Sequence, residues 1–146
     1  MDGKTLSKIG IVFSTYNSNI TQRLLDGSLK TLQAAGWDGP RVEILSVPGA
    51  WELPLAAQRL LQRSEMQAVV VLGAVIRGET THDQHINRAV SQALMDLMLS
   101  SGKPVGFGLL TCNTLEQAIH RAGGNVGNKG CETAEAVLAM LPTLEA

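Results

Sequence analysis

The chain has 146 residues, 45% of them hydrophobic, and a formal net charge of −1. This is enough apolar material for one domain with a buried core, and we expect residues 1–146 to form a single domain. Dispersed Lys and Arg exclude the basic stripe that nucleic-acid binding requires, and no apolar run reaches membrane-spanning length. Because the first residues also lack the apolar core of a signal peptide, we expect a cytosolic protein.

Strand and helix patterns alternate along the chain. Apolar, β-branched runs predict strands at residues 8–13, 41–47, 68–76 and 105–111. Helical spacing predicts helices at about 20–35, 52–63 and 82–100, one after Asn113, which has capping-box spacing to Glu116, and one following 123–130. Crossovers of this length make neighbouring strands parallel. We therefore predict a flavodoxin-like three-layer α/β/α sandwich with a four-stranded parallel sheet.

The carboxyl ends of parallel strands meet at one edge of the sheet. Here that edge collects four polar segments, at residues 14–17, 48–52, 77–82 and 111–113. The third segment supplies a cation at Arg77, a flexible backbone with free N–H groups at Gly78 and an imidazole at His82. We therefore expect an anionic ligand and proton transfer at this edge.

The two cysteines, Cys112 and Cys131, have no His or Cys at ligand spacing. This pattern predicts neither a disulfide framework nor a zinc site. We expect both to be small buried thiols.

The predicted helix at 82–100 is apolar on two sides. One stripe at helical spacing consists of Ile86, Ala89, Val90, Ala93, Leu94 and Leu97, and we expect the sheet to bury it. Met95 and Leu99 point roughly the opposite way. They indicate either a subunit interface or two scattered surface hydrophobes.

Seven blocks in order resemble the 6,7-dimethyl-8-ribityllumazine synthase family, over nearly the whole chain from Lys8 onward. They are Tyr16-Asn17 with Ile20-Thr21, VPGAWELP at 47–54, GAVIRGETTH at 73–82, PVGFG at 104–108, LEQAI at 115–119, RAG at 121–123 and GNKG at 127–130. The resemblance implies condensation of 5-amino-6-(D-ribitylamino)uracil with 3,4-dihydroxy-2-butanone 4-phosphate to 6,7-dimethyl-8-ribityllumazine, phosphate and water. It implies no metal and no organic cofactor.

By this resemblance, Tyr16 stacks on the pyrimidine ring, and Asn17, Val75 and Ile76 line the same ring. From the residues alone, Tyr16 is either such a platform or an ordinary amphipathic surface residue. Val75 and Ile76 would be core members, because they continue an apolar strand.

The resemblance implies that Glu52 binds the ribityl chain, with the backbone of Ala50 and Trp51 beside it. A carboxylate suits a polyol because it accepts several hydroxyl hydrogen bonds at once. Alternatively, Glu52 is an acid favoured by a helix N-terminus, and Trp51 packs its ring into the core.

The phosphate is assigned, again by resemblance, to Arg121 and to the backbone N–H groups around Gly78, Glu79 and Thr80. His82 is the proton-transfer candidate. Without the resemblance, Arg121 is an ordinary helix-end cation and His82 a capping or structural histidine.

In the family the site lies between adjacent subunits of a ring-shaped pentamer, and the neighbour supplies the positions of Phe107 and Lys129. Some pentamers assemble further into icosahedral shells. We therefore expect a homo-oligomer and predict a pentamer; whether pentamers form a shell is not predicted. The expected ligands are small-molecule substrates, with neither nucleic acid nor a membrane as partner. Taken alone, Phe107 would be core and Lys129 solvated.

The chain departs from the family pattern at two places. After His82 the family has an aromatic residue and then an acid, where this chain has Asp83 and Gln84; position 120, often acidic, is His120. We expect neither departure to touch the ring, ribityl or phosphate groups directly. Their effect is expected on rate and pH optimum.

Two other functions fit parts of the sequence. A non-catalytic binder of lumazine or flavin would have lost the proton and phosphate machinery, yet His82, Arg121 and Lys129 are present. A flavodoxin-like electron carrier would need a phosphate loop rich in Ser, Thr and Gly after the first strand, and residues 14–18 match this only in part.

Overall fold

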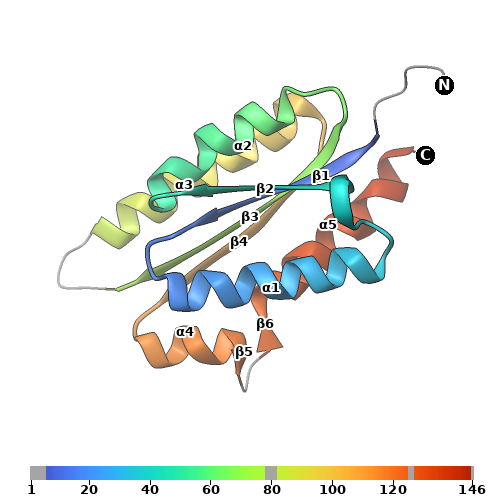
Figure 1. Ribbon diagram of the computed structural model, residues 1–146. Coiled ribbons are helices and arrows are strands. Elements are labelled where there is room, and N and C mark those ends of the chain that lie inside the picture. The colour runs from blue at the N-terminus through green and yellow to red at the C-terminus, as the bar shows by residue number, and fades with distance from the viewer. Residues whose placement is uncertain (1–5, 78–81, 125–126, 146) are drawn as a thin grey trace.

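The computed structural model describes residues 6–77, 82–124 and 127–145 (Figure 1). Four parallel strands form one sheet in the order β2-β1-β3-β4: β1 (Lys8–Ser14), β2 (Val42–Val47), β3 (Met66–Ile76) and β4 (Val105–Cys112). One face is covered by α2 (Leu53–Leu61) and α3 (His82–Ser101), and the other by α1 (Ser18–Ala34), α5 (Lys129–Glu145) and the short α4 (Leu115–Arg121). The predicted fold class is confirmed.

The core consists of two apolar layers, one on each face of the sheet. Val70 and Leu72 of β3 pack in the layer beneath α1 and α5, and Val69 and Val71 pack in the layer beneath α2 and α3. Since both faces of β3 are covered, its sequence is a continuous apolar run without alternation. This rigid centre fixes the loops that follow the strands at the left of Figure 1.

The start of α4 (Leu115–Arg121) differs from the prediction by one residue. Its N-cap is Thr114, whose Oγ1 accepts a hydrogen bond from the backbone N–H of Gln117 at 3.2 Å. The side-chain oxygen of Gln117 accepts in turn from the N–H of Asn113 at 2.8 Å. The N-cap bond predicted for Asn113 is therefore made by Thr114, and the side chain at the third helical position, Gln117, accepts from the residue before the N-cap and not from the N-cap itself.

The connection predicted at 123–130 contains two short antiparallel strands, β5 (Ala122–Gly124) and β6 (Gly127–Asn128), and α5 begins within it, at Lys129. Glycine-rich segments carry no apolar or β-branched alternation, so the sequence pattern gave no sign of these strands. Short 3-10 turns, η1 (Gly39–Arg41) and η2 (Ala50–Glu52), precede β2 and α2.

The apolar stripe of α3 is buried in part. Val90 and Leu94 are in the core, but Ala89 is exposed, so the prediction is wrong there. Ala89 faces a hollow between α2 and α3 lined also by Trp51, and its methyl group is too small to fill it. On the far side of the helix Leu99 is 73% exposed. No helix in the described part of the chain is long and apolar enough to cross a membrane.

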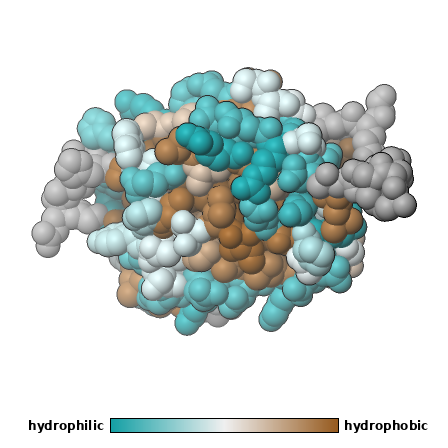
Figure 2. Space-filling view, turned by 45° about the horizontal axis from the view of Figure 1, so that its top comes forward, coloured by the Kyte–Doolittle hydropathy of each residue, from teal (hydrophilic) through white to brown (hydrophobic). Residues whose placement is uncertain are grey.

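Hydrophobic side chains also reach the surface. Figure 2 shows them gathered in the middle of one face and bordered by hydrophilic residues. Contiguous apolar surface like that in Figure 2 is typical of a face that another molecule covers. The exposed large hydrophobic side chains are spread over the molecule: Ile44 lies on β2 and Phe107 on β4, at opposite edges of the sheet.

Candidate active site

A cleft of about 320 Å³ lies at the strand ends between the loops after β1 and β2 and the first turns of α3. We call it the Tyr16 cleft; it is lined by Tyr16, Asn17, Gly49, Ala50, Trp51, Ala74, Val75, Ile76, Asp83 and Ile86. It therefore brings together the predicted ring-lining residues and two of the residues predicted to adjoin the ribityl chain.

Backbone hydrogen bonds hold the two loops together. The N–H of Thr15 donates to the carbonyl of Val47 at 2.8 Å, and that of Tyr16 donates to the carbonyl of Pro48 at 2.9 Å. Asn17 then turns the chain into α1 with a left-handed backbone, φ 63°. These bonds fix the backbone that carries the Tyr16 side chain.

Asn17 also connects this loop to the central strand. Its Nδ2 donates to the carbonyl of Ala74 at 3.0 Å, and its own carbonyl accepts from the N–H groups of Ile20 and Thr21. Asn tolerates the left-handed region better than most residues, which explains its use at this corner. One of the two N–H donors of its side-chain amide is thereby committed to the fold.

The two aromatic side chains of the cleft are open to solvent. Tyr16 is 74% exposed and Trp51 is 62% exposed. The alternative that Trp51 packs its ring into the core is therefore wrong. Both rings offer a flat face that a planar ligand can cover, and Val75 and Ile76 are half-buried between core and cleft.

Glu52 makes a local bond at the start of α2. Its Oε1 accepts from the backbone N–H of Gly49 at 2.9 Å, the interaction that an acid at a helix N-terminus makes. Glu52 is exposed and is not among the residues that line the Tyr16 cleft. The predicted contact of Glu52 with the ribityl chain stays a prediction.

Four residues of the cleft were not predicted as site residues: Gly49, Ala74, Asp83 and Ile86. Asp83 and Ile86 lie three positions apart on α3, so both face the cleft. Asp83 forms part of the wall beside the predicted ring-lining residues, and the expectation that it touches no ligand group directly stays a prediction. The i, i+3 spacing was visible in the sequence, but the direction of that helix face was not. His120, by contrast, lines neither this cleft nor the groove described next.

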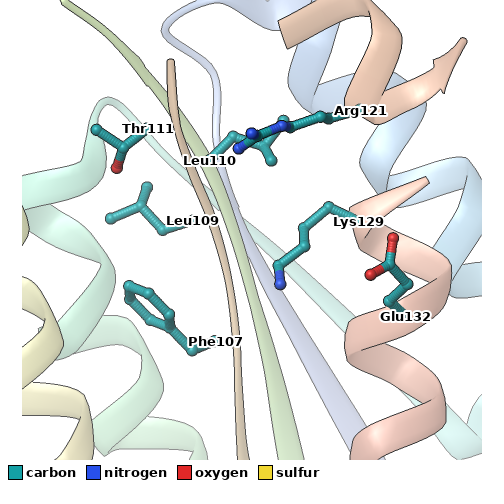
Figure 3. A pocket seen from close by; sticks show the side chains of 7 residues that line it. All are labelled: Phe107, Leu109, Leu110, Thr111, Arg121, Lys129 and Glu132. Carbon is teal, nitrogen blue, oxygen red and sulfur yellow. The ribbon is translucent and has the colours of Figure 1, made fainter. Parts of the chain in front are cut away.

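A second hollow, of about 470 Å³, lies along β4, the edge strand of the sheet (Figure 3). We call it the Lys129 groove; it is lined by Phe107, Leu109, Leu110, Thr111, Arg121, Lys129 and Glu132. Arg121 and Lys129 reach toward β4 from α4 and α5, while Phe107 projects from the other side of the strand. Phe107 is 44% exposed, so its alternative assignment to the core is wrong.

The two cations of the groove suit an anion. No carboxylate among the described residues forms an ion pair with Arg121 or Lys129; the ion pairs there involve Lys8, Arg63 and His120. Arg121 is exposed and Lys129 half-buried. A guanidinium and an ammonium group that share one hollow can bind a phosphate through several charge-assisted hydrogen bonds.

Lys129 is positioned by contacts between the start of α5 and α1. Asn128 donates from Nδ2 to the carbonyl of Arg23 at 3.1 Å, and Ser28 Oγ donates to the carbonyl of Gly130 at 2.8 Å. A Cβ atom at Gly130 would collide with the carbonyl oxygen of Leu24. The two helices can approach this closely only because position 130 is glycine.

Cys112 lies at the end of β4 and is buried, as predicted, whereas Cys131 is only half-buried. Burial raises the pKa of the Cys112 thiol, and the positive charge of Arg121 offsets part of this rise. The carbonyl of Cys112 accepts from the N–H of Arg77 and so extends the ladder between β3 and β4.

Several predicted site residues lie outside the described part of the chain. They are Gly78, Glu79 and Thr80. α3 begins at His82, as predicted, but the His82 side chain is also outside the description. Within the described residues, no three His, Cys, Asp or Glu side chains come together as a metal site would require.

The Tyr16 cleft and the Lys129 groove have no lining residue in common. The structure groups Arg121 with Phe107 and Lys129, on the edge-strand side, and apart from the ring-lining residues. Among the described residues, the predicted site residues that line these hollows therefore form two separate groups, which we call half-sites, and Glu52 belongs to neither.

Comparison with known proteins points to one family. The family model described as 6,7-dimethyl-8-ribityllumazine synthase matches residues 7–145. A Rhodopirellula baltica protein of that name is 52% identical over 134 residues, covering 92% of this chain and 86% of the relative. A protein of the same name from Syntrophus aciditrophicus is 44% identical, over 94% of this chain and 89% of the relative. Another from Thermus thermophilus is also 44% identical, over 100% of this chain and 98% of the relative.

Proposed function

Since the chain belongs to the 6,7-dimethyl-8-ribityllumazine synthase family, and is thus a transferase of riboflavin biosynthesis, we propose its substrates and product. It condenses 5-amino-6-(D-ribitylamino)uracil with 3,4-dihydroxy-2-butanone 4-phosphate to 6,7-dimethyl-8-ribityllumazine, phosphate and water. The observation that supports this most directly is the Tyr16 cleft, which joins an exposed aromatic face to half-buried aliphatic side chains at the strand ends. Such a cleft suits a flat heterocycle.

In this proposal the pyrimidine ring stacks on Tyr16 and lies against Asn17, Val75 and Ile76. The ribityl chain extends past Ala50 and Trp51 toward Glu52, whose solvent-exposed carboxylate can accept hydroxyl hydrogen bonds. The backbone around residues 78–80 and the cations of the Lys129 groove hold the phosphate of the second substrate.

We further propose that one active site is shared by two copies of the chain. The Tyr16 cleft comes from one copy, and Phe107, Arg121 and Lys129 come from its neighbour. Two observations support this: the half-sites share no residue, and β4 is an edge strand with the exposed Phe107 on it. An uncovered edge strand and exposed apolar side chains are typical of surfaces that another copy covers. We propose a pentamer as the assembly.

The chemistry needs no protein nucleophile. The pyrimidine 5-amino nitrogen attacks the ketone carbon, and loss of water gives an imine. His82 removes a proton from the adjacent carbon as phosphate leaves, and the resulting enol becomes a ketone. The ribityl-bearing nitrogen then attacks this ketone, and loss of a second water closes the ring. Much of the acceleration comes from orienting two bound reactants.

The test is to mix the purified protein with both substrates and to follow lumazine fluorescence against the uncatalysed background. We expect a rate well above background, and a slower but measurable rate for His82→Ala, because orientation survives without the base. Turnover at background level by the wild-type protein, with the pyrimidine still bound, would contradict the synthase and favour a non-catalytic binder. Complete loss in His82→Ala with intact substrate binding would contradict the orientation argument.

A further inference from the structure

Glu132 is an acid in the lining of the Lys129 groove. Its side chain is exposed and lies on the α5 side of the groove, three positions after Lys129 (Figure 3). The sequence analysis assigned it no role. Among the described lining residues, Glu132 is the only one with a negative charge, and it shares the groove with the positive charges of Arg121 and Lys129.

The carboxylate of Glu132 lies close to the start of β6 at Gly127. A Cβ atom at Gly127 would lie 3.7 Å from Oε2 of Glu132, an ordinary van der Waals distance. Gly127 has φ 111°, a backbone conformation that favours glycine, so position 127 carries no side chain that would cover the carboxylate. The carboxylate is therefore left open on this side.

The charge of Glu132 is not cancelled by a neighbouring cation. Within the described part of the chain, Glu132 forms no ion pair with Arg121 or Lys129. The groove has a volume of about 470 Å³ and is thus roughly 10 Å across, close to the Debye length at physiological ionic strength. An anion inside it is therefore attracted by two cations and repelled by one carboxylate, and the repulsion grows with the charge of the anion.

We propose that Glu132 is a specificity-determining residue of the Lys129 groove: its carboxylate repels a second phosphoryl group, so that the groove selects a phosphate monoester over a diphosphate. This inference rests on the proposed function, in which the groove holds the phosphate of the butanone substrate. A single phosphate lies between Arg121 and Lys129 and gains from both cations. A diphosphate carries more negative charge and fills more of the groove, so the repulsion from Glu132 weakens its binding more.

The test compares the affinities of the protein for inorganic phosphate and for pyrophosphate, in buffer without divalent cations, which would bind pyrophosphate. Glu132→Gln removes the charge and keeps the shape of the side chain, while Glu132→Asp keeps the charge. The matched control is Glu135→Gln, the same change at an exposed position of the same helix, outside the groove lining. Calorimetric titration gives the Kd of each anion at about 0.05 M and about 0.5 M NaCl, and Tm checks that each variant is folded.

We expect Glu132→Gln to lower the Kd for phosphate about 2-fold and the Kd for pyrophosphate about 5-fold, because the more highly charged anion gains more when the carboxylate is removed. Glu132→Asp and Glu135→Gln should keep the wild-type ratio of the two Kd values. The gain in Glu132→Gln should shrink at the higher salt concentration, where the charges are screened. The KM for the butanone phosphate should fall with the Kd for phosphate, while the Kd for the pyrimidine and the Tm stay unchanged.

An unchanged ratio of the two Kd values in Glu132→Gln would overturn the role of Glu132 and leave the proposed function intact. Weaker binding of both anions in this variant would also overturn it, because the carboxylate would then hold a cation in place for the ligand. An equal gain in Glu135→Gln would mean that net charge alone sets the affinity, against the proposal.

Two further outcomes separate this inference from the proposed function. If the wild-type protein binds neither anion, the phosphate role of the groove and the role of Glu132 fail together, whatever the rate of lumazine formation. If the anions bind as expected but lumazine forms only at the background rate, the proposed function fails and the selectivity of the groove stands.

Discussion

In the Tyr16 cleft the backbone sets the positions, whereas in the Lys129 groove long side chains do. The cleft is held by N–H to carbonyl bonds from Thr15 and Tyr16 and by the amide of Asn17. The groove relies on Arg121 and Lys129, which extend from two helices toward an edge strand. A planar ring needs a fixed surface, while a phosphate can be met by flexible cations. The two half-sites therefore differ in how they respond to mutation.

The largest effect is expected from a substitution at Gly130, where α5 begins beside the Lys129 groove. In Gly130→Ala the new Cβ meets the carbonyl oxygen of Leu24, backbone against backbone, so α1 and α5 must separate. We expect the free energy of unfolding in urea to fall by about 3 kcal/mol. Ala136→Ser, on the exposed side of α5, is the control and is expected to change it by less than about 0.5 kcal/mol. Equal stability of Gly130→Ala would show that the two helices are not held in contact here.

The next largest effect is expected from Arg121→Ala. Removing one charge-assisted partner of the phosphate should raise the KM for 3,4-dihydroxy-2-butanone 4-phosphate about 10- to 100-fold, while the Kd for the pyrimidine stays unchanged. Steady-state kinetics and direct binding measure the two values. Arg59→Ala, on the exposed part of α2, serves as control. If both ligands lost affinity equally, the division into two half-sites would be wrong.

Asn17 allows the backbone and side-chain contributions to the cleft to be separated. Asn17→Gly keeps the left-handed backbone but loses the bond to Ala74, so it should cost about 1 kcal/mol. Asn17→Ala loses the bond and is also strained at φ 63°, so about 2 kcal/mol is expected. Thermal unfolding gives the stabilities, and pyrimidine affinity should fall in the same order. An equal cost for the two variants would mean that the backbone conformation carries no strain.

The smallest effect concerns Cys112 at the end of β4. Because burial raises the pKa of its thiol above the ordinary 9.0, the folded protein keeps the proton at a pH where the unfolded chain loses it. Stability from this group is therefore complete below pH 9 and declines as the pH rises further. In Cys112→Ala the decline in unfolding free energy between pH 9 and 10.5 should be shallower by less than about 1 kcal/mol. An identical pH slope in variant and wild type would contradict a shifted thiol.

The sequence was sufficient for the sheet and for most of the cleft. Long apolar runs placed β1, β3 and β4, and the polar segments after them placed Tyr16 and Asn17 at the functional edge. The sequence was insufficient for features that depend on how the helices pack against the sheet. Whether position 83 faces the cleft depends on how α3 lies across the sheet, and the grouping of Arg121 with Lys129 depends on the glycine-rich β5 and β6, which have no strand pattern.

Exposure of single aromatic residues was also beyond the sequence pattern. Phe107 belongs to a strand whose neighbours Gly106 and Gly108 are buried, so the local sequence looks like core. It is exposed on the edge strand β4, although Val105 and Leu109, on the same face of that strand, are buried. The local pattern therefore does not decide its environment.

The bond from Ser28 to Gly130 joins residues 102 positions apart, and that from Asn128 to Arg23 spans 105. During synthesis α1 must therefore wait for nearly the whole chain before its partner α5 exists. The bond from Asn17 to Ala74 spans only 57 residues and can form much earlier. We expect the nascent chain to complete the Tyr16 cleft first. The parts of α1 and β4 that pack against α5 remain exposed until α5 has been synthesised. In that interval the nascent chain depends most on protection from aggregation.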